Sequence, residues 1–279
     1  MNWQWFIELA LEEDVGAGDF TSVSCLDAQA RGKAVIRVKQ PCVLAGVELA
    51  AAVFRFVDPD AELQFFARDG DRLEAGTEII MLSARAQALL SAERLALNCL
   101  QRMSGVATLT RQYVDAVAGF PARILDTRKT TPLFRAAEKW AVRIGGGHNH
   151  RFGLYDMILI KDNHIDFCGG VERAIHRAQE YLQRTGKNLP IEVEARSLEE
   201  VKRILHCGGI QRILLDNLDL KQLADAVLLI GGRHETEASG GITLANVRAV
   251  AATGVDFISV GALTHSYQSI DISMKAVVS

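Results

Sequence analysis

The sequence lacks the usual features of secreted, membrane-spanning and metal-knuckle proteins. Its five cysteines, Cys25, Cys42, Cys99, Cys168 and Cys207, are widely spaced and form no Cys-x-x-Cys pair. That pattern favours free thiols in a reducing cytosol over disulfides or a structural zinc site. No apolar run approaches the roughly 18 residues that a membrane helix needs, and the N-terminus lacks the basic start of a signal peptide. We therefore expect a cytoplasmic protein.

An excess of charge of either sign is also missing. The 31 Lys and Arg residues nearly balance 34 Asp and Glu residues, which gives a net charge of -3 at pH 7. No whole-molecule field therefore attracts nucleic acid or an anionic membrane, and any anion-binding site must be local. With 279 residues, 49% of them hydrophobic, the chain is long enough for one large core or two linked cores.

The first third of the chain alternates helical and strand-like stretches, which is typical of a small α+β unit. Apolar residues at helical spacing predict helices over residues 3–13 and 45–57, separated early on by a loop over 16–22. Alternating or short apolar runs predict strands over 33–39, 62–67 and 76–84.

A long helical stretch follows over residues 88–120, with Ser104 and Gly105 as a candidate break. Four polar residues fall on one face of this helix because they are spaced at i, i+4, i+7 and i+8: Arg94, Asn98, Gln101 and Arg102. Such a stripe is typical of a solvated helix face, and the alternative is a face turned towards a ligand or a partner.

After Pro121, short apolar runs recur, and each ends in polar or glycine residues. The runs end at Asp126, Lys161, Glu194, Asp216, Ser239 and Gly261. Steps of 22 to 35 residues between these ends suit β-α units, so six or seven such units predict a barrel or open barrel of parallel strands. In such barrels the chemistry lies at the C-terminal ends of the strands, where these polar residues fall.

The last two runs end in glycine-containing segments, Ser239-Gly240-Gly241 and Gly261-Ala262. Barrels commonly bind phosphate in the corresponding loops, through main-chain N–H groups and a helix N-terminus. Together the two segments predict a phosphate site.

Positive charge gathers in one segment, residues 123–164, which holds eight Lys or Arg residues against four acids. Part of it, containing Arg135, Glu138, Lys139 and Arg143 at helical spacing, is typical of a solvated and internally paired helix face. The other cationic or histidine residues lie at strand ends or beside the glycine run 145–147: Arg128, Lys129, His150, Arg151 and Lys161. Cations held at a barrel mouth need a counter-charge, which a polyanionic substrate supplies.

Two acids, Glu194 and Asp216, end consecutive runs on the opposite side of the repeat. They either form salt bridges with the cations or supply oxygen ligands to Mg²⁺ or to sugar hydroxyls. No Ser-His or Cys-His nucleophile spacing is evident, which favours electrostatic and positional catalysis.

Three other interpretations of these motifs differ in strength. The run GGGHNHR is no dinucleotide fingerprint, because His150 stands where G-x-G-x-x-G needs glycine. The His148-x-His150 pair lacks the further histidine ligands of a metal hydrolase at later strand ends, His164 excepted. Lys161 is a candidate Schiff-base lysine of an aldolase-type barrel, which remains the alternative enzyme.

The motifs together resemble the quinolinate phosphoribosyltransferase family, the decarboxylating enzymes of de novo NAD synthesis. The resemblance rests on EEDVGAGDFTS (12–22), AERLALNCLQRMSGVAT (92–108), LDTRKTTP (125–132), EKWAVRIGGGHNHRFGLYDMILIKDNHI (138–165), EVEARSLEE (192–200), ILLDN (213–217), EASGGI (237–242) and GVDFISVGALTHS (254–266). The chain departs from the family pattern at Leu133-Phe134, Trp140 and His148.

The resemblance implies an N-terminal α/β sandwich over residues 1–110, joined by the tail 268–279, and an open α/β barrel over 111–267 that carries the active site. It also implies a homodimer in which Arg94 is donated to the neighbouring site. It assigns Arg128, Lys129, His150, Arg151 and Lys161 to the quinolinate and phosphoribosyl pocket, Glu194 and Asp216 to the ribose and magnesium side, and Ser239, Gly240, Gly241, Gly261 and Ala262 to the 5-phosphate loops.

The implied reaction joins quinolinate to phosphoribosyl pyrophosphate with loss of CO2, and it uses Mg²⁺ but no organic cofactor. Lys129, Lys161, Glu194 and Asp216 are the implied catalytic residues. His150 and Arg151 are expected to reach the substrate carboxylates, with His148 pointing elsewhere. A non-catalytic pyridine-carboxylate binding protein is the further alternative.

Overall fold

The computed structural model describes residues 3–277 and divides into two compact units. The first contains Met1–Arg111, Thr131–Gly146 and Tyr267–Ser279, and the second contains Gln112–Thr130 and Gly147–Ser266. In the described part of the chain, no helix combines the length and the apolar character needed to cross a bilayer.

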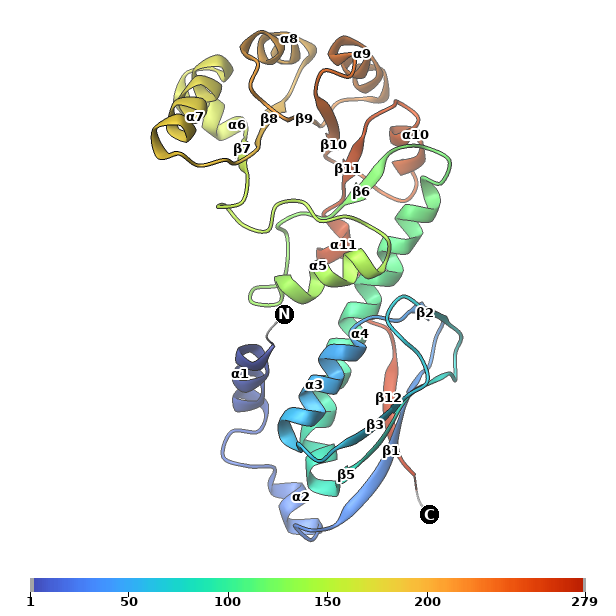
Figure 1. Ribbon diagram of the computed structural model, residues 1–279. Coiled ribbons are helices and arrows are strands. Elements are labelled where there is room, and N and C mark those ends of the chain that lie inside the picture. Colours follow the sequence, from blue (N-terminus) through green and yellow to red (C-terminus); the bar gives the residue numbers. More distant parts are fainter. Residues whose placement is uncertain (1–2, 278–279) are drawn as a thin grey trace. The chain divides into compact units, whose positions relative to one another are not determined.

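The first unit is built on a four-stranded antiparallel sheet in the order β12-β1-β5-β3 (Figure 1). Its strands are β1 (Arg31–Val38), β3 (Glu62–Phe65), β5 (Glu78–Arg85) and β12 (Ile272–Ala276). A small pair, β2 (Cys42–Val43) and β4 (Arg72–Leu73), lies beside it. Ala34 of β1 is in register with Ala276 of β12, so the last strand of the chain pairs with the first.

Helices α1 (Gln4–Asp14), α2 (Phe20–Cys25), α3 (Val47–Val57) and α4 (Ala86–Ala116) accompany this sheet. The loop predicted over 16–22 is wrong from Phe20 onwards, because the Asp19 side chain accepts the main-chain N–H of Ser22 at 3.0 Å and starts a helix.

The candidate break in α4 is also wrong, since the helix is continuous through Ser104 and Gly105. Ser104 is buried and its hydroxyl bonds the main-chain N–H and C=O of Ala45. A Cβ at Gly105 would meet the main-chain oxygen of Gln268. Both residues therefore serve close packing of α4 against its neighbours.

The segment Thr131–Gly146, which holds α5 (Arg135–Ile144), packs in the first unit, although from the sequence we place it in the barrel domain. Aromatic contacts explain its position: Trp140 stacks on Trp3 at 5.9 Å between ring centroids, and Phe134 lies 5.5 Å from Phe6. Two of the residues that depart from the family pattern are therefore those that attach α5 to α1.

The predicted solvated face of α5 is wrong for Glu138 and Lys139, which are 0% and 3% exposed. The Glu138 carboxylate accepts the main-chain N–H and the hydroxyl of Thr131 at 3.0 and 2.8 Å. Arg102 donates to the same hydroxyl at 2.9 Å, so it is no simple solvated residue either. Polar groups buried in this way are satisfied by one another.

The second unit is a six-stranded parallel sheet in the order β6-β11-β10-β9-β8-β7. Its strands are β6 (Arg123–Leu125), β7 (Ile158–Ile160), β8 (Ile191–Ala195), β9 (Arg212–Asp216), β10 (Glu235–Ser239) and β11 (Phe257–Ser259). Each coincides with a predicted run, so the open parallel α/β barrel is confirmed. The order closes no ring: β7 and β6 are the two ends of the sheet, so this is an open barrel.

The helices of this unit are α6 (Asp162–Cys168), α7 (Val171–Thr185), α8 (Leu198–Cys207), α9 (Leu220–Ile230), α10 (Val247–Ala251) and α11 (Ala262–His265). Helices α7, α8 and α9 follow one another around the outside of the strands (Figure 1). The strands are buried because the helices cover one face, which is why they read as short apolar runs.

The glycine run begins at the end of α5, where two of its members meet different needs. A Cβ on Gly145 would lie 2.6 Å from the main-chain oxygen of Ala107 on α4, so only glycine fits this contact. Gly146 has φ 90°, a conformation that residues with a Cβ rarely adopt. Beyond the run, His148 donates its main-chain N–H to Ile124 at 2.8 Å and so extends the edge of the sheet beside β6.

Candidate active site

A cavity of about 660 Å³ lies in the second unit, at the C-terminal ends of its strands. Almost all the residues singled out from the sequence line it: Arg128, Lys129, His150, Arg151, Lys161, Glu194, Asp216, Ser239, Gly240, Gly241, Gly261 and Ala262. Arg94 is not a lining residue; it is exposed on α4 in the first unit. His148 is also exposed and lies outside the lining, as expected.

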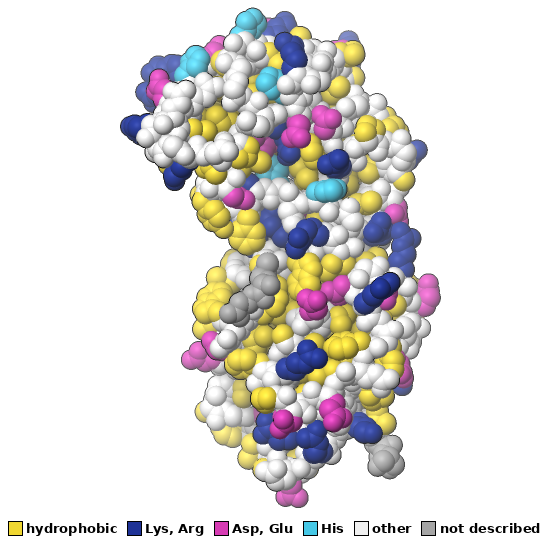
Figure 2. All heavy atoms as spheres, viewed as in Figure 1, with side chains coloured by type: hydrophobic (Ala, Val, Ile, Leu, Met, Phe, Trp, Pro, Cys, Tyr) yellow, Lys and Arg dark blue, Asp and Glu magenta, His cyan; other side chains and the backbone are white. Residues whose placement is uncertain are grey.

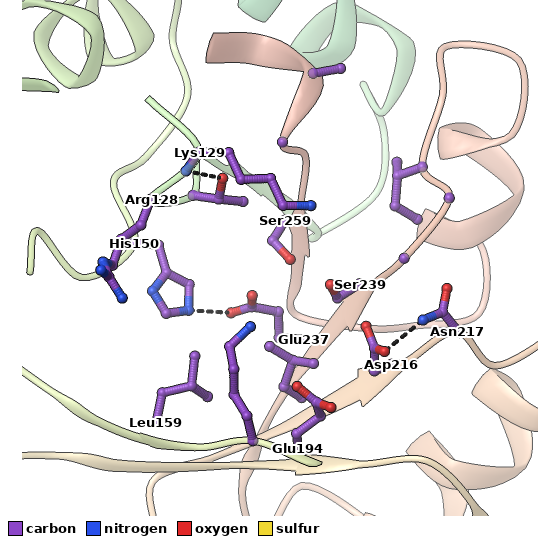
Figure 3. A pocket seen from close by; sticks show the side chains of 18 of the residues that line it. Arg128, Lys129, His150, Leu159, Glu194, Asp216, Asn217, Glu237, Ser239 and Ser259 are labelled. Carbon is purple, nitrogen blue, oxygen red and sulfur yellow. Dashed lines mark hydrogen bonds and ion pairs between the residues drawn. The ribbon is translucent and has the colours of Figure 1, made fainter. Parts of the chain in front are cut away.

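One side of the cavity carries positive charge from the segments after β6 and β7. Figure 3 shows the Lys129 side chain extending across the cavity towards Ser259. The main chain beneath it is fixed, because the Thr264 hydroxyl donates to the Lys129 carbonyl at 2.7 Å and the Lys129 N–H donates to the Thr127 hydroxyl at 3.0 Å. These two main-chain hydrogen bonds position the Lys129 side chain without involving its ammonium group.

Arg151 is only 9% exposed, and its Nη1 donates to the main-chain oxygen of Met157 at 3.3 Å. Burial lowers the pKa of this guanidinium, and the neighbouring positive charge of Arg128 lowers it further. Two guanidinium groups held near one another in a cavity favour an anion between them.

Lys161 directly follows β7, and its main-chain N–H donates to Nδ1 of His164 at 3.0 Å. Burial raises the pKa of Glu194, and the ammonium charge of Lys161 offsets part of that rise. Lys161 therefore belongs to the cationic side and also interacts electrostatically with an acid of the opposite side.

The acidic side contains Glu194 on β8 and Asp216 at the end of β9. Burial raises the pKa of Glu194, and the negative charge of Asp216 raises it further. Within the part of the chain that the structure describes, neither carboxylate forms an ion pair with a lysine or arginine. The simple salt-bridge interpretation of these two acids is therefore wrong, and two adjacent carboxylates in a cavity favour a divalent cation or sugar hydroxyls.

Two glycine loops form the remaining wall. Gly240 follows β10 with φ 93°, and a Cβ there would collide with the Asn217 side chain. Asn217 itself has φ 55° and donates from Nδ2 to Asp216 at 2.6 Å. A Cβ on Gly261 would lie 3.0 Å from Cδ of Lys129. These glycines bring the main chain close to the cavity, as a phosphate-binding loop requires.

His150 is held from two directions. Its main-chain N–H donates to Oδ1 of Asp126 at 2.9 Å, and its ring Nδ1 accepts the main-chain N–H of Arg151 at 2.7 Å. Its Nε2 lies 3.0 Å from Oε2 of Glu192 and 3.5 Å from Oε2 of Glu237, towards which the ring points in Figure 3.

Ten lining residues are not among those predicted from the sequence. They are Thr127, Leu159, Asp162, Leu214, Asn217, Glu237, Ile242, Thr243, Ser259 and His265. Three of them directly follow a predicted run end, so extending each run end by two residues would have found Thr127, Asp162 and Asn217. Glu237 lies inside β10. Its signal is a charged residue between the uncharged residues Thr236 and Ala238 of this strand.

The charge of the cavity is local. Basic and acidic side chains are mixed across the face shown in Figure 2, with no uniformly basic surface. Of the basic residues in 123–164, four line the cavity: Arg128, Lys129, Arg151 and Lys161.

Comparison with known proteins identifies the family of this chain. The description "Quinolinate phosphoribosyl transferase, C-terminal domain" matches residues 106–275, and the N-terminal domain of the same family matches residues 19–104. The chain belongs to the quinolinate phosphoribosyltransferase family. The resemblance stated from the sequence motifs is therefore confirmed.

Relatives and solved structures agree with this assignment. The chain is 45% identical to a chloroplastic nicotinate-nucleotide pyrophosphorylase [carboxylating] of Arabidopsis thaliana, over 96% of this chain and 81% of that protein. It is 43% identical to a quinolinate phosphoribosyltransferase [decarboxylating] of Nicotiana glauca, over 96% and 80%. The structure of NadC from Streptococcus pyogenes superposes with a TM-score of 0.93 at 38% identity, covering 99% of this chain and 97% of that one.

Proposed function

We propose that this chain transfers the phosphoribosyl group of phosphoribosyl pyrophosphate to quinolinate with decarboxylation, giving nicotinate mononucleotide, CO2 and pyrophosphate. Membership of the quinolinate phosphoribosyltransferase family carries this conclusion. The cavity supports it, since cations line one side and acids with glycine loops line the other. The reaction is a pentosyl transfer of NAD biosynthesis.

The cationic side suits quinolinate, which is a dianion. Arg128, Arg151 and Lys161 neutralise its carboxylates, and Lys129 lies between that position and the glycine loops. At an effective dielectric near 20, each charge contact at about 4 Å contributes about 4 kcal/mol. Without such contacts, two anions would repel each other in one cavity.

The glycine loops suit the 5-phosphate of the co-substrate. Main-chain N–H groups around Gly240, Gly241 and Gly261 approach closely because no Cβ intervenes. Glu194 and Asp216 then face the ribose hydroxyls. This division holds the pyridine nitrogen near C1 of the ribose, which is the positional part of catalysis.

The chemistry follows from that placement. The pyridine nitrogen forms a bond to C1 while the C1–O bond breaks and its electron pair leaves with pyrophosphate. The ring is then cationic and stabilises the carbanion that remains on its carbon atom when the adjacent carboxylate departs as CO2. The carbon left behind takes up a proton from water, so no organic cofactor is needed. Fixed charges around the cavity stabilise the charge that develops in each step.

Magnesium fits the acidic side of the cavity. Mg²⁺ binds proteins through one or two carboxylates together with substrate phosphates, which is the donor set that Glu194 and Asp216 would complete with pyrophosphate. Burial raises the pKa of Glu194, and the negative charge of Asp216 raises it further, which supports a cation between these two acids. Mg²⁺ held there by Glu194 and Asp216 would supply positive charge to the leaving pyrophosphate.

The assembly is proposed to be a cytoplasmic homodimer, in which Arg94 of each subunit completes the cationic side of the neighbouring cavity. Arg94 is exposed on α4 of the first unit, which supports contact with another subunit. No organic cofactor, nucleic acid or membrane is part of the proposal.

The direct test is release of labelled CO2 from carboxyl-labelled quinolinate. We expect release only when phosphoribosyl pyrophosphate and Mg²⁺ are both present, together with one pyrophosphate for each CO2. Quinolinate binding without pyrophosphate release would indicate a binding protein instead. Borohydride trapping of a carbonyl ligand on Lys161 would indicate aldolase chemistry, and either result contradicts the proposal.

A further inference from the structure

The ring of His150 carries its proton on one defined nitrogen. Nδ1 accepts the main-chain N–H of Arg151 at 2.7 Å, and a ring nitrogen that accepts a hydrogen bond bears no proton. This contact favours the ring form that carries its proton on Nε2. That nitrogen faces two carboxylates at 3.0 and 3.5 Å, although neither contact is aligned as a full hydrogen bond.

The two carboxylates belong to Glu192 on β8 and Glu237 on β10, both 0% exposed. Arg212, on the strand between them, offers the compensating charge: its Nη1 lies 2.8 Å from Oε2 of Glu237. Arg212 also stacks on the Phe257 ring at 3.9 Å and pairs with Glu235 at 3.0 Å. The carboxylates are thus held beneath the cavity by a cation that is itself fixed in place.

We propose that Glu192 and Glu237 are positioning residues for quinolinate binding, which hold His150 as the neutral anchor of the Arg151 main chain. The negative charge that this carboxyl pair carries attracts the Nε2 proton, so that Nδ1 accepts from Arg151. The guanidinium of Arg151 is thereby aimed into the cavity. His150 acts through Arg151 and carries no charge to the substrate. The inference rests on the proposed function, because it names quinolinate as the ligand of Arg151.

A buried metal is the competing interpretation of the same cluster. His150, Glu192 and Glu237 each offer a ligand atom, and these atoms lie within 4.8 Å of one another. However, the Arg212 guanidinium already contacts Glu237, and a second cation there would be repelled by it. The accepted hydrogen bond at Nδ1 and the fixed charge of Arg212 favour the anchor.

Paired substitutions of His150 separate an anchor from a cation. His150→Asn places an amide oxygen where Nδ1 lies, so it retains the acceptor for Arg151, whereas His150→Gln retains only a donor towards the carboxylates. We expect His150→Gln and Glu192→Gln each to raise the KM for quinolinate about tenfold, the effect of losing one hydrogen bond near a charge. The KM for phosphoribosyl pyrophosphate should change less than about twofold, and His150→Asn should raise the KM for quinolinate less than His150→Gln does.

A double-mutant cycle and a matched control complete the experiment. Glu192→Gln should add little in the His150→Asn background, because both changes act on one contact. Glu235→Gln removes a carboxylate that also pairs with Arg212 but is exposed and does not contact His150, so it should leave both KM values unchanged. Circular dichroism and thermal midpoints verify that each variant folds.

Nitrogen NMR of His150 in the unsubstituted enzyme needs no variant at all. The inference predicts a protonated Nε2 and an unprotonated Nδ1. Protons on both nitrogens, additive effects in the cycle, or a shift of the His150 signals on adding Zn²⁺ that Mg²⁺ does not cause would each overturn it. Failure of the proposed function looks different, because the unsubstituted enzyme would then release no CO2.

Discussion

The two sides of the cavity use different means to bind anions. After β6 and β7, long side chains such as Arg128 and Lys161 bring full positive charges. After β8 to β11, two carboxylates and glycine loops offer oxygen ligands and main-chain N–H groups instead. The difference indicates that the two sides bind different molecules: a compact dicarboxylate needs charge, whereas a phosphorylated sugar also needs close main-chain approach and ligands for its hydroxyls and metal.

The two sides also differ in how they are fixed. The cationic side depends on hydrogen bonds between its main chain and side chains distant in the sequence. The Thr264 hydroxyl donates to the Lys129 carbonyl, and the Asp126 carboxylate accepts the main-chain N–H of His150. The glycine side depends on backbone conformation, with Gly240 and Gly241 both at positive φ. Removing a side chain should therefore impair ligand binding at the cationic side, whereas straining the backbone should impair ligand binding at the glycine side.

The largest effect is expected for Lys129→Ala. Removal of one charge contact worth about 4 kcal/mol should lower kcat/KM about a thousandfold. Because the hydrogen bonds of Lys129 use only its main chain, the fold should be unaffected. Arg151→Ala should abolish turnover likewise.

Steady-state kinetics and thermal unfolding check this expectation. Lys202→Ala is the matched control, since Lys202 is an exposed lysine of α8 that pairs with Glu199 outside the cavity. A near-normal rate for Lys129→Ala would remove Lys129 from the cationic side.

Hybrid dimers test whether the cationic side is complete in one chain. Arg94→Ala and Lys129→Ala should each be inactive alone. If Arg94 acts in the neighbouring subunit, each mixed dimer contains one intact cavity, and an equimolar mixture should recover about a quarter of wild-type activity. No recovery after subunit exchange would show that Arg94 does not act across the dimer.

Backbone strain on the other side should give a smaller and selective effect. Gly240→Ala combines positive φ with a collision against Asn217, whereas Gly241→Ala has positive φ but open space around its Cβ. We expect the KM for phosphoribosyl pyrophosphate to rise about tenfold for Gly240→Ala and less for Gly241→Ala, with quinolinate binding unchanged. Equal effects on the two substrates would show that the sides are not separate.

The smallest effect concerns stability beneath the cationic side. Burial, and then the charge of Glu192, raise the pKa of Glu237 from 4.5 to about 7. Between these values the folded chain holds a proton that the unfolded chain has lost, so the free energy of unfolding should fall as pH rises through this window. Glu237→Gln should make that fall shallower in urea unfolding followed from about pH 5 to about pH 7. An unchanged slope would contradict the burial of an ionisable carboxyl here.

Much of the barrel and its cavity could be predicted from the sequence, because parallel strands appear as short apolar runs and their C-terminal ends meet at one edge. Lys161 and Asp216 were found in this way. The packing of Glu138 and the partners of His150 could not, since Arg102, Glu192 and Glu237 are distant along the chain. Burial of a charged side chain depends on such distant partners, and helical spacing carries no information about them.

Local rules also failed where one side chain decided the outcome. The stretch 16–22 looks like a loop because of its glycines, yet Asp19 caps a helix within it. Similarly, Trp140 attaches α5 to α1 by stacking on Trp3. A single capping or stacking contact outweighs average composition in such short segments.

The most direct test is a crystal structure with quinolinate and an unreactive analogue of phosphoribosyl pyrophosphate bound together. We expect the two carboxylates of quinolinate within hydrogen-bond distance of Arg128, Arg151 or Lys161, and the 5-phosphate on the loops at Gly240 and Gly261. Quinolinate on the glycine side, or bound outside the cavity, would contradict the division into two sides.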